Sequence, residues 1–303
     1  MGSIRIGNSG WSYKDWIGPF YPGGTSSRDM LGIYFSRFDI VEVNSTFYDV
    51  PKRSTVEAWA RECSRWEGRE ITIKIPRVIS HDMTMDEDAS RMVSELVKFE
   101  KAVLMPLDDA GVLGAVLFQA SPYFTVRGDI KYKARSRPMV PVPGYILGMK
   151  RLKEISECLR SLPGEPAIEL RNSSWLNEEL GLRREAVDIL LQNGVTLVTV
   201  DGPSFPWLSE ETSRYNYIRF HGRNKEGWFR TNESDPSARY DHCYTDEELL
   251  SREEEIRIMA SKVGNDTRIF FNNHPRGMAP KNASRLKEML GIPDPIGAFD
   301  RFW

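Results

Sequence analysis

One order of segments recurs along this chain: a short apolar run, a polar turn and then an amphipathic stretch. Eight of the apolar runs have the length and composition of β-strands. They span residues 4–7, 40–43, 71–75, 112–118, 167–170, 196–200, 217–220 and 269–271. Strands that alternate with helices form parallel sheets covered by those helices. Eight repeats within 303 residues predict one α/β domain, a single (β/α)8 TIM-like barrel over residues 1–303 with a C-terminal tail at 291–303.

Two segments depart from this repeat. Between strands six and seven, the stretch DGPSFPWLSEETSRYN is too rich in Pro and Gly for a full helix, so we expect a reduced crossover there. After strand four, residues 125–144 carry five basic residues and one acidic residue. We expect a basic loop insertion, either functional or simply a solvated charged face. A doubly wound sheet is the alternative fold, but no Gly-rich dinucleotide loop follows the first strand.

Charge and cysteine content narrow the function classes. The net charge of −2 and the pI of about 6.2 give no whole-chain attraction to nucleic acid or to a membrane surface. No run reaches the 18 or so apolar residues of a membrane span. The three cysteines are odd in number, widely spaced and without a CxxC pair, which is typical of reduced thiols. These features predict a cytoplasmic protein that does not bind membranes.

The stretch DIVEVNSTFYDVP, residues 39–51, places the carboxylate of Glu42 inside a strand. A buried charge costs several kcal/mol unless it is paired. Alternation along a barrel strand turns Val41 and Val43 toward the helices, and Glu42 and Asn44 toward the interior. Active sites of such barrels lie at the C-terminal ends of the strands, which is where Glu42 and Asn44 stand. Glu42 is therefore predicted to line a site.

The other strands also deliver polar side chains at this end. We assign catalytic roles to Glu42, Glu169, Asp201 and His221. We assign substrate binding to Asn44, Lys74, Arg77, Gln119, Arg171, Arg219, Asn272, Asn273, Trp11, Tyr48 and Trp175. His81 and His274 fall in loops on the same rim. Each assignment has a structural alternative: the charges as ion pairs lining the barrel, the asparagines as loop ties, and the aromatic rings as packing.

Seven motifs occur in an order that resembles the YecE-like family, domain of unknown function 72. They are GNSGW, VEVNSTFYDVP, IKIPR followed by SH, LGAVLFQASPYF, ELRNSSW, YIRFHG, and FNN followed by GMAPKNA. The resemblance runs from about residue 4 to residue 290, nearly the whole chain. It implies a TIM-barrel fold, in agreement with the strand count, and it brings no established reaction with it.

Three functions fit this ring of residues. The first is an enzyme that uses acid/base chemistry on an anionic substrate that is phosphorylated or contains a sugar or nucleotide, because Arg and Lys bind phosphate while an acid or base moves a proton. The second is a metal-dependent phosphodiesterase or nuclease-like hydrolase, with Glu169, Asp201 and His221 holding a divalent metal. The chain lacks HxH and HExxH spacing, and the nearby cations oppose metal binding.

The third is a non-catalytic nucleic-acid or nucleotide binder that uses the basic loop 127–137 and the aromatic rim. The acidic pI counts against it. The sequence pattern requires no cofactor and does not indicate an oligomeric state.

Overall fold

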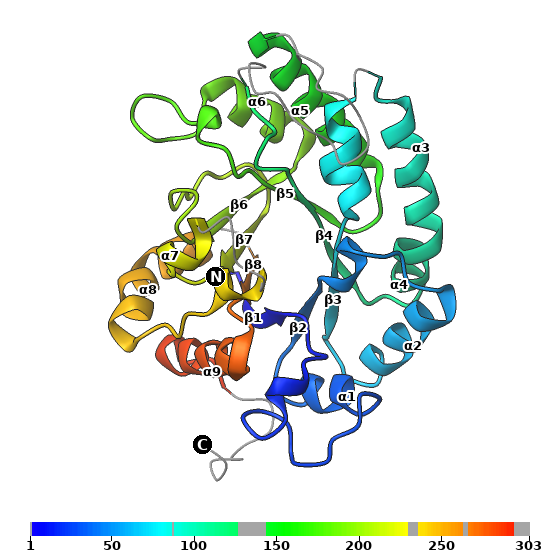
Figure 1. Cartoon of the computed structure of the whole chain (residues 1–303), viewed down its shortest axis with the longest axis vertical. Helices are drawn as coiled ribbons and strands as arrows, with labels where there is room; N and C mark the ends of the chain where they lie inside the picture. The colour runs from blue at the N-terminus through cyan, green and yellow to red at the C-terminus, as the bar shows by residue number, and fades with distance from the viewer. Residues whose placement is uncertain (1, 87, 127–143, 230–235, 263–265, 294–303) are drawn as a thin grey trace.

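The computed structural model describes residues 2–86, 88–126, 144–229, 236–262 and 266–293. Within them, eight parallel strands close into one barrel in chain order, and β8 pairs back to β1 (Figure 1). The strands are β1 (Ile4–Ser9), β2 (Ile40–Val43), β3 (Glu70–Lys74), β4 (Leu113–Gln119), β5 (Glu165–Glu169), β6 (Thr196–Asp201), β7 (Tyr215–Phe220) and β8 (Asp266–Phe271). The predicted (β/α)8 TIM-like barrel is confirmed.

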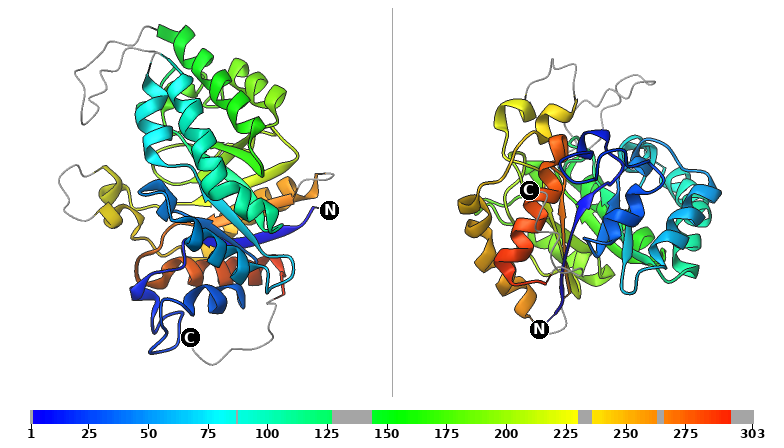
Figure 2. Two further views of the ribbon diagram at one scale, coloured as in Figure 1. Left: turned by 90° about the vertical axis from the view of Figure 1, so that its right-hand side faces the viewer. Right: turned by 90° about the horizontal axis from the view of Figure 1, so that it is seen from below.

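Helices surround the strands on the outside (Figures 1 and 2). They are α1 (Met30–Phe35), α2 (Arg53–Cys63), α3 (Ser90–Phe99), α4 (Met105–Asp109), α5 (Gly144–Ser161), α6 (Arg184–Asn193), α7 (Lys225–Phe229), α8 (Asp246–Ser261) and α9 (Met278–Leu290). Residues 202–214, between β6 and β7, contain no helix, which confirms the reduced crossover. The predicted basic loop 127–137 lies outside the described residues. In the described chain, no helix has the length and apolar character needed to cross a membrane.

Two apolar cores lie on the two sides of the sheet. Inside the barrel, Leu117 and Phe270 belong to a small cluster, while a larger cluster packs the helices onto the outer face. β1 approaches β2 so closely that a Cβ added at Gly7 would lie 1.9 Å from the carbonyl oxygen of Ile40. Only glycine fits at that contact, which lets the middle of β1 lie against the start of β2.

Ion pairs fill the N-terminal end of the barrel. Arg268 of β8 contacts Glu70 of β3 at 2.9 Å and also pairs with Glu165 of β5. Arg5 of β1 contacts the same Glu70 at 2.5 Å, and the ring of Tyr215 lies 5.2 Å from the Arg268 guanidinium. Each of these buried or half-buried charges has a partner of opposite sign, so this end of the interior has a structural role.

Candidate functional site

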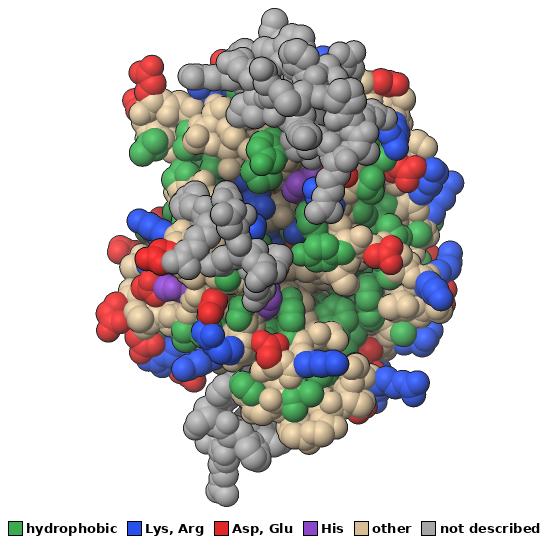
Figure 3. All heavy atoms as spheres, viewed as in Figure 1, with side chains coloured by type: hydrophobic (Ala, Val, Ile, Leu, Met, Phe, Trp, Pro, Cys, Tyr) green, Lys and Arg blue, Asp and Glu red, His purple; other side chains and the backbone are tan. Residues whose placement is uncertain are grey.

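A second polar layer occupies the interior at the C-terminal ends of the strands. Glu42, Lys74, Gln119, Glu169 and Arg219 hold the last inward positions of β2, β3, β4, β5 and β7, and all five are buried. Strand alternation turns all five toward the interior, and the parallel register places Gln119 beside Glu169. This face is hollowed near the barrel axis, with Lys, Arg and His side chains inside the hollow (Figure 3).

Arg219 joins the two buried carboxylates of this layer. Its Nη2 lies 2.6 Å from Oε1 of Glu42, and its Nη1 pairs with Oε2 of Glu169. Glu42 also accepts hydrogen bonds from Ser9 Oγ at 2.7 Å and from the Tyr217 hydroxyl at 2.5 Å. The charge that made Glu42 costly in a strand is therefore compensated by three donors from β1 and β7.

Glu169 is as fully engaged as Glu42. Gln119 Nε2 donates to Oε1 at 2.7 Å, and Arg171 Nε lies 3.3 Å from the same oxygen. Burial opposes ionisation, but Arg219, His221 and Arg171 together outweigh it and hold the pKa of Glu169 well below its usual range. Glu169 is therefore ionised at neutral pH and is a weak base.

His221 is the last member of a chain of polar contacts that begins at Asn44, the residue directly after β2. Asn44 Nδ2 donates to Asn272 Oδ1 at 3.2 Å, and Asn272 Nδ2 lies 3.0 Å from His221 Nδ1. His221 Nε2 lies 3.3 Å from both oxygens of Glu169. Because Nδ1 accepts from Asn272, the ring proton is on Nε2 and faces Glu169. Burial outweighs the attraction of Glu169 and lowers the pKa of His221 to about 4, so the ring is neutral at pH 7.

Lys74 differs from the other charged members of this layer because no described residue forms an ion pair with it. Its Nζ lies 3.8 Å from the centroid of the Phe47 ring, and the side chain is 7 % exposed. Within the described chain, no carboxylate lies within ion-pair distance of Nζ, and no acceptor forms a hydrogen bond with it. Burial and the neighbouring Arg219 lower the pKa of Lys74 to about 7, against the weaker opposing effect of Glu42 and Glu169.

The loop after β3 adds two more polar groups beside this lysine. The His81 ring lies edge-on to Phe47 with the centroids 5.1 Å apart, and its Nδ1 is 3.0 Å from Ser80 Oγ. Burial, together with Lys74 and two arginines, lowers the pKa of His81 to about 3, so this imidazole is also neutral. One of those arginines is Arg77, which is half-buried on the same loop and close enough to act on the charge of His81.

The aromatic residues predicted at the rim divide into one exposed ring and two packed ones. Tyr48 is 84 % exposed. Trp11 is buried with its ring 5.5 Å from Trp59. Trp175 is fully buried, and its Nε1 donates to the carbonyl of Phe124 at 2.8 Å. The prediction that Trp11 and Trp175 offer stacking surfaces is therefore wrong, because each ring packs a loop against the barrel.

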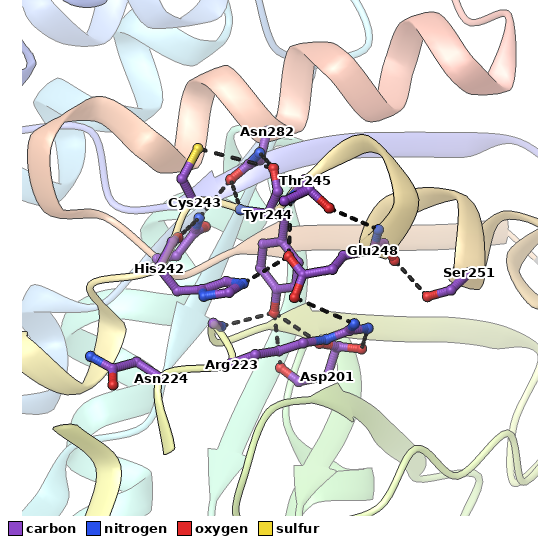
Figure 4. A network of polar contacts seen from close by, with 12 residues as sticks. Asp201, Arg223, Asn224, His242, Cys243, Tyr244, Thr245, Glu248, Ser251 and Asn282 are labelled. Atoms are coloured by element: carbon purple, nitrogen blue, oxygen red, sulfur yellow. Dashed lines mark hydrogen bonds and ion pairs between the residues drawn. The ribbon is translucent and has the colours of Figure 1, made fainter. Parts of the chain in front are cut away.

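Asp201 and Asn273 are placed outside the barrel interior. The inward positions of β6 are Val198 and Val200, so Asp201 faces the helices. It accepts from Arg223 at 2.7 and 2.8 Å, from Arg252 of α8 at 2.8 Å and from the Tyr244 hydroxyl at 2.9 Å. Figure 4 shows Arg223 and Tyr244 converging on this carboxylate.

The side chain of Asn273 likewise turns outward, donating to the His242 carbonyl and to Asn282 at 2.8 Å. Asp201 and Asn273 therefore lie outside the polar layer inside the barrel, and the catalytic role of Asp201 and the substrate-binding role of Asn273 stay predictions. The metal set of Glu169, Asp201 and His221 is not brought together either. Among the residues that the structure describes, no three His, Cys, Asp or Glu side chains are grouped to hold a metal ion.

Three residues of the site were not expected from the sequence. Tyr217 binds Glu42 from inside the barrel, and its spacing of two and four from Arg219 and His221 was a usable signal. The Trp228 ring lies 5.8 Å from His221 and 5.5 Å from the Arg171 guanidinium. Tyr240 lies 5.7 Å from Trp228. Trp228 lies on the short helix α7 and Tyr240 ends a 3-10 helix, Pro236–Tyr240, and neither short segment has an apolar period that offered a signal.

Fold and site together define an α/β-barrel protein with a buried polar site at the C-terminal mouth, in which Arg and Lys outnumber the carboxylates. The chain belongs to the family described as protein of unknown function DUF72, whose model matches residues 5–297. This match confirms the resemblance that the seven motifs predicted.

Related proteins agree with this assignment. The UPF0759 protein YunF of Bacillus subtilis (strain 168) is 25 % identical over 298 residues, which cover 95 % of each chain. A solved DUF72 family protein from Thermotoga maritima is 28 % identical with a TM-score of 0.74, covering 95 % of this chain and 99 % of that one. A DUF72 family protein from Enterococcus faecalis is 23 % identical with a TM-score of 0.72, covering 96 % of both chains.

Proposed function

We propose that this protein is an enzyme that binds a small anionic substrate, phosphorylated or containing a sugar or nucleotide, at the C-terminal mouth of the barrel and moves a proton on it. The observation that carries this proposal is the unpaired, buried amine of Lys74 beside Arg171. Lys74, Arg171 and Arg219 oppose only two carboxylates in this layer, and His81 and His221 are neutral at pH 7. An anion would supply the missing negative charge.

The two glutamates would hold the site in shape. Glu42 and Glu169 already accept from Arg219 and other donors, and the pKa of Glu169 is held well below its usual range, which does not suit a general acid. Lys74 is the group whose pKa lies near neutrality, where a side chain exchanges protons most effectively. In this proposal, Arg171 and Arg77 bind the anion, Lys74 transfers the proton, and Tyr48 offers a ring to a sugar or base.

A cytoplasmic location is part of the proposal. Cys63, Cys158 and Cys243 are all free thiols, as expected in a reducing compartment.

Anion binding can be tested by thermal shift with inorganic phosphate, sugar phosphates and nucleotides. We expect at least one of these anions to raise the melting temperature of the wild type, and less so at high salt. Arg171→Gln should weaken binding about tenfold or more, because a charge-assisted hydrogen bond is lost. Arg184→Gln is the matched control, since that arginine is 79 % exposed on α6. No shift with any anion, or equal shifts in Arg171→Gln and the wild type, would overturn the proposal.

A further inference from the structure

Lys74 and Lys287 are the two buried lysines of the described chain, and they are treated differently by the fold. Lys287, on α9, donates to the carbonyl of Arg37 at 3.1 Å, as a buried ammonium with a structural role should. Among the described residues Lys74 has no such acceptor, and its Nζ lies over the Phe47 ring. The cation–π contact with Phe47 and the nearby Glu42 and Glu169 offset only part of the cost of burying this amine.

The carboxylates near Lys74 are occupied by other donors. Glu42 accepts from Arg219, Ser9 and Tyr217. Glu169 accepts from Arg219 and Gln119. Their charges are therefore largely neutralised before they reach Lys74, which leaves burial and Arg219 as the dominant influences on the amine.

An amine in these surroundings has chemistry that an ordinary lysine lacks. With a pKa of about 7, a large part of Lys74 carries a free nitrogen lone pair at neutral pH. Desolvation next to another cation is a recognised way to make a lysine nucleophilic toward carbonyl groups. The His81 ring, edge-on to the same Phe47 ring, is neutral and so adds no positive charge that would repel an iminium product.

We propose that Lys74 is a covalent nucleophile that forms a Schiff base with an aldehyde or ketone carrying a phosphate or carboxylate. This inference rests on the proposed anion site, since Arg171 would hold the anionic group while Nζ reaches the carbonyl carbon. The nitrogen lone pair forms the C–N bond as the C=O π bond opens onto oxygen. The two hydrogens of the neutral amine then leave with that oxygen as one water, and a C=N bond remains.

The full-length protein can be tested with glycolaldehyde phosphate and sodium cyanoborohydride at pH 7. The reductant converts any imine into a stable secondary amine, which peptide mass mapping locates. We expect Lys74 to be labelled roughly tenfold or more faster than exposed Lys98, because the lowered pKa of Lys74 leaves much of this amine neutral at that pH. Inorganic phosphate should slow the labelling, and Lys74→Arg should abolish it.

Two comparisons separate this inference from the proposed function. Neutral glycolaldehyde should label Lys74 equally well in the wild type and in Arg171→Gln, whereas the phosphorylated probe should label Lys74 of that variant about tenfold more slowly. If phosphate raises the melting temperature but Lys74 is labelled no faster than Lys98, the covalent role is wrong and the anion site stands. If Lys74 is labelled quickly by both probes and phosphate has no effect on either labelling or melting, the anion site is wrong, and with it the substrate class named here.

Discussion

A buried lysine loses several kcal/mol of hydration energy, and in most proteins a hydrogen bond from the ammonium group to an acceptor compensates part of that loss. At the scale of single residues, Lys74 is the exception in this barrel, because Glu42 and Glu169 are saturated by other donors. The same site contains two histidines that burial keeps neutral, His81 and His221. Of these three groups, Lys74 is the one whose pKa lies near neutrality.

The pKa of Lys74 makes the stability of the folded barrel depend on pH in a defined window. Unfolded lysine binds its proton up to about pH 10.4, whereas folded Lys74 releases it above about pH 7. Between these values the unfolded chain binds more protons, so stability rises with pH. Relative to Lys74→Met, the wild type should gain about 1.4 kcal/mol of unfolding free energy per pH unit across this window.

Urea unfolding of both proteins from pH 6 to pH 10 measures this difference. Lys98→Met, at a position 67 % exposed on α3, should show no comparable slope and serves as the control. A pH-independent gap between the wild type and Lys74→Met would show that Lys74 keeps its proton in the folded state, contrary to the expected behaviour.

At the scale of elements, alternation within strands explains which assignments could be made from sequence. In β2 and β5, Glu42 and Glu169 each interrupt an apolar run, so the inward face could be identified. In β6 both faces of the strand are apolar, as is usual when helices cover a parallel sheet, and nothing in the run marks Asp201 as outward. A shift of one residue in the assumed alternation moves a side chain from the barrel interior, where the site lies, to the outer face, where it contacts the helices.

Where a helix starts is likewise not decided by local spacing alone. Thr245 and Glu248 form the capping box at the start of α8, as their spacing predicts. The same spacing at Ser54 and Glu57 forms no cap, because α2 already begins at Arg53. The partners of a side chain across the barrel, such as Arg219 for Glu42, depend on distances between strands that no local pattern contains.

Asp201 connects β6 to α8, and its replacement tests whether that connection is structural. Asp201→Asn keeps the shape but cannot accept from Arg223, Arg252 and Tyr244 as an ionised carboxylate does. We expect a loss of roughly 1–3 kcal/mol in unfolding free energy and faster amide hydrogen exchange in α8. Phosphate binding at the mouth should be unchanged.

The matched control is Asp188→Asn on α6, where an exposed ion pair with Arg184 contributes little. Loss of phosphate binding in Asp201→Asn with unaltered exchange in α8 would instead return Asp201 to the site.

At the scale of the whole molecule, the C-terminal polar layer ties distant parts of the barrel together. Arg219 of β7 reaches β2 through Glu42 and β5 through Glu169, which are 177 and 50 residues away along the chain. His221, Asn272 and Asn44 extend the contacts to the loops after β8 and β2. The barrel therefore closes both through its ladder of strands and through buried charges across its interior.

Removing the central cation should destabilise the barrel as one unit. Arg219→Met leaves two buried carboxylates without their shared partner, which should cost roughly 3–5 kcal/mol of unfolding free energy. Adding Glu42→Gln and Glu169→Gln to that variant removes the unpaired charges and should recover much of the lost unfolding free energy.

Urea unfolding followed by far-ultraviolet and near-ultraviolet circular dichroism should give coincident transitions, as expected for a single cooperative domain. Arg65→Met, at a position 74 % exposed, should change stability by about 1 kcal/mol or less. Full stability of Arg219→Met alone, or separate transitions for the two signals, would contradict a barrel held together through this arginine.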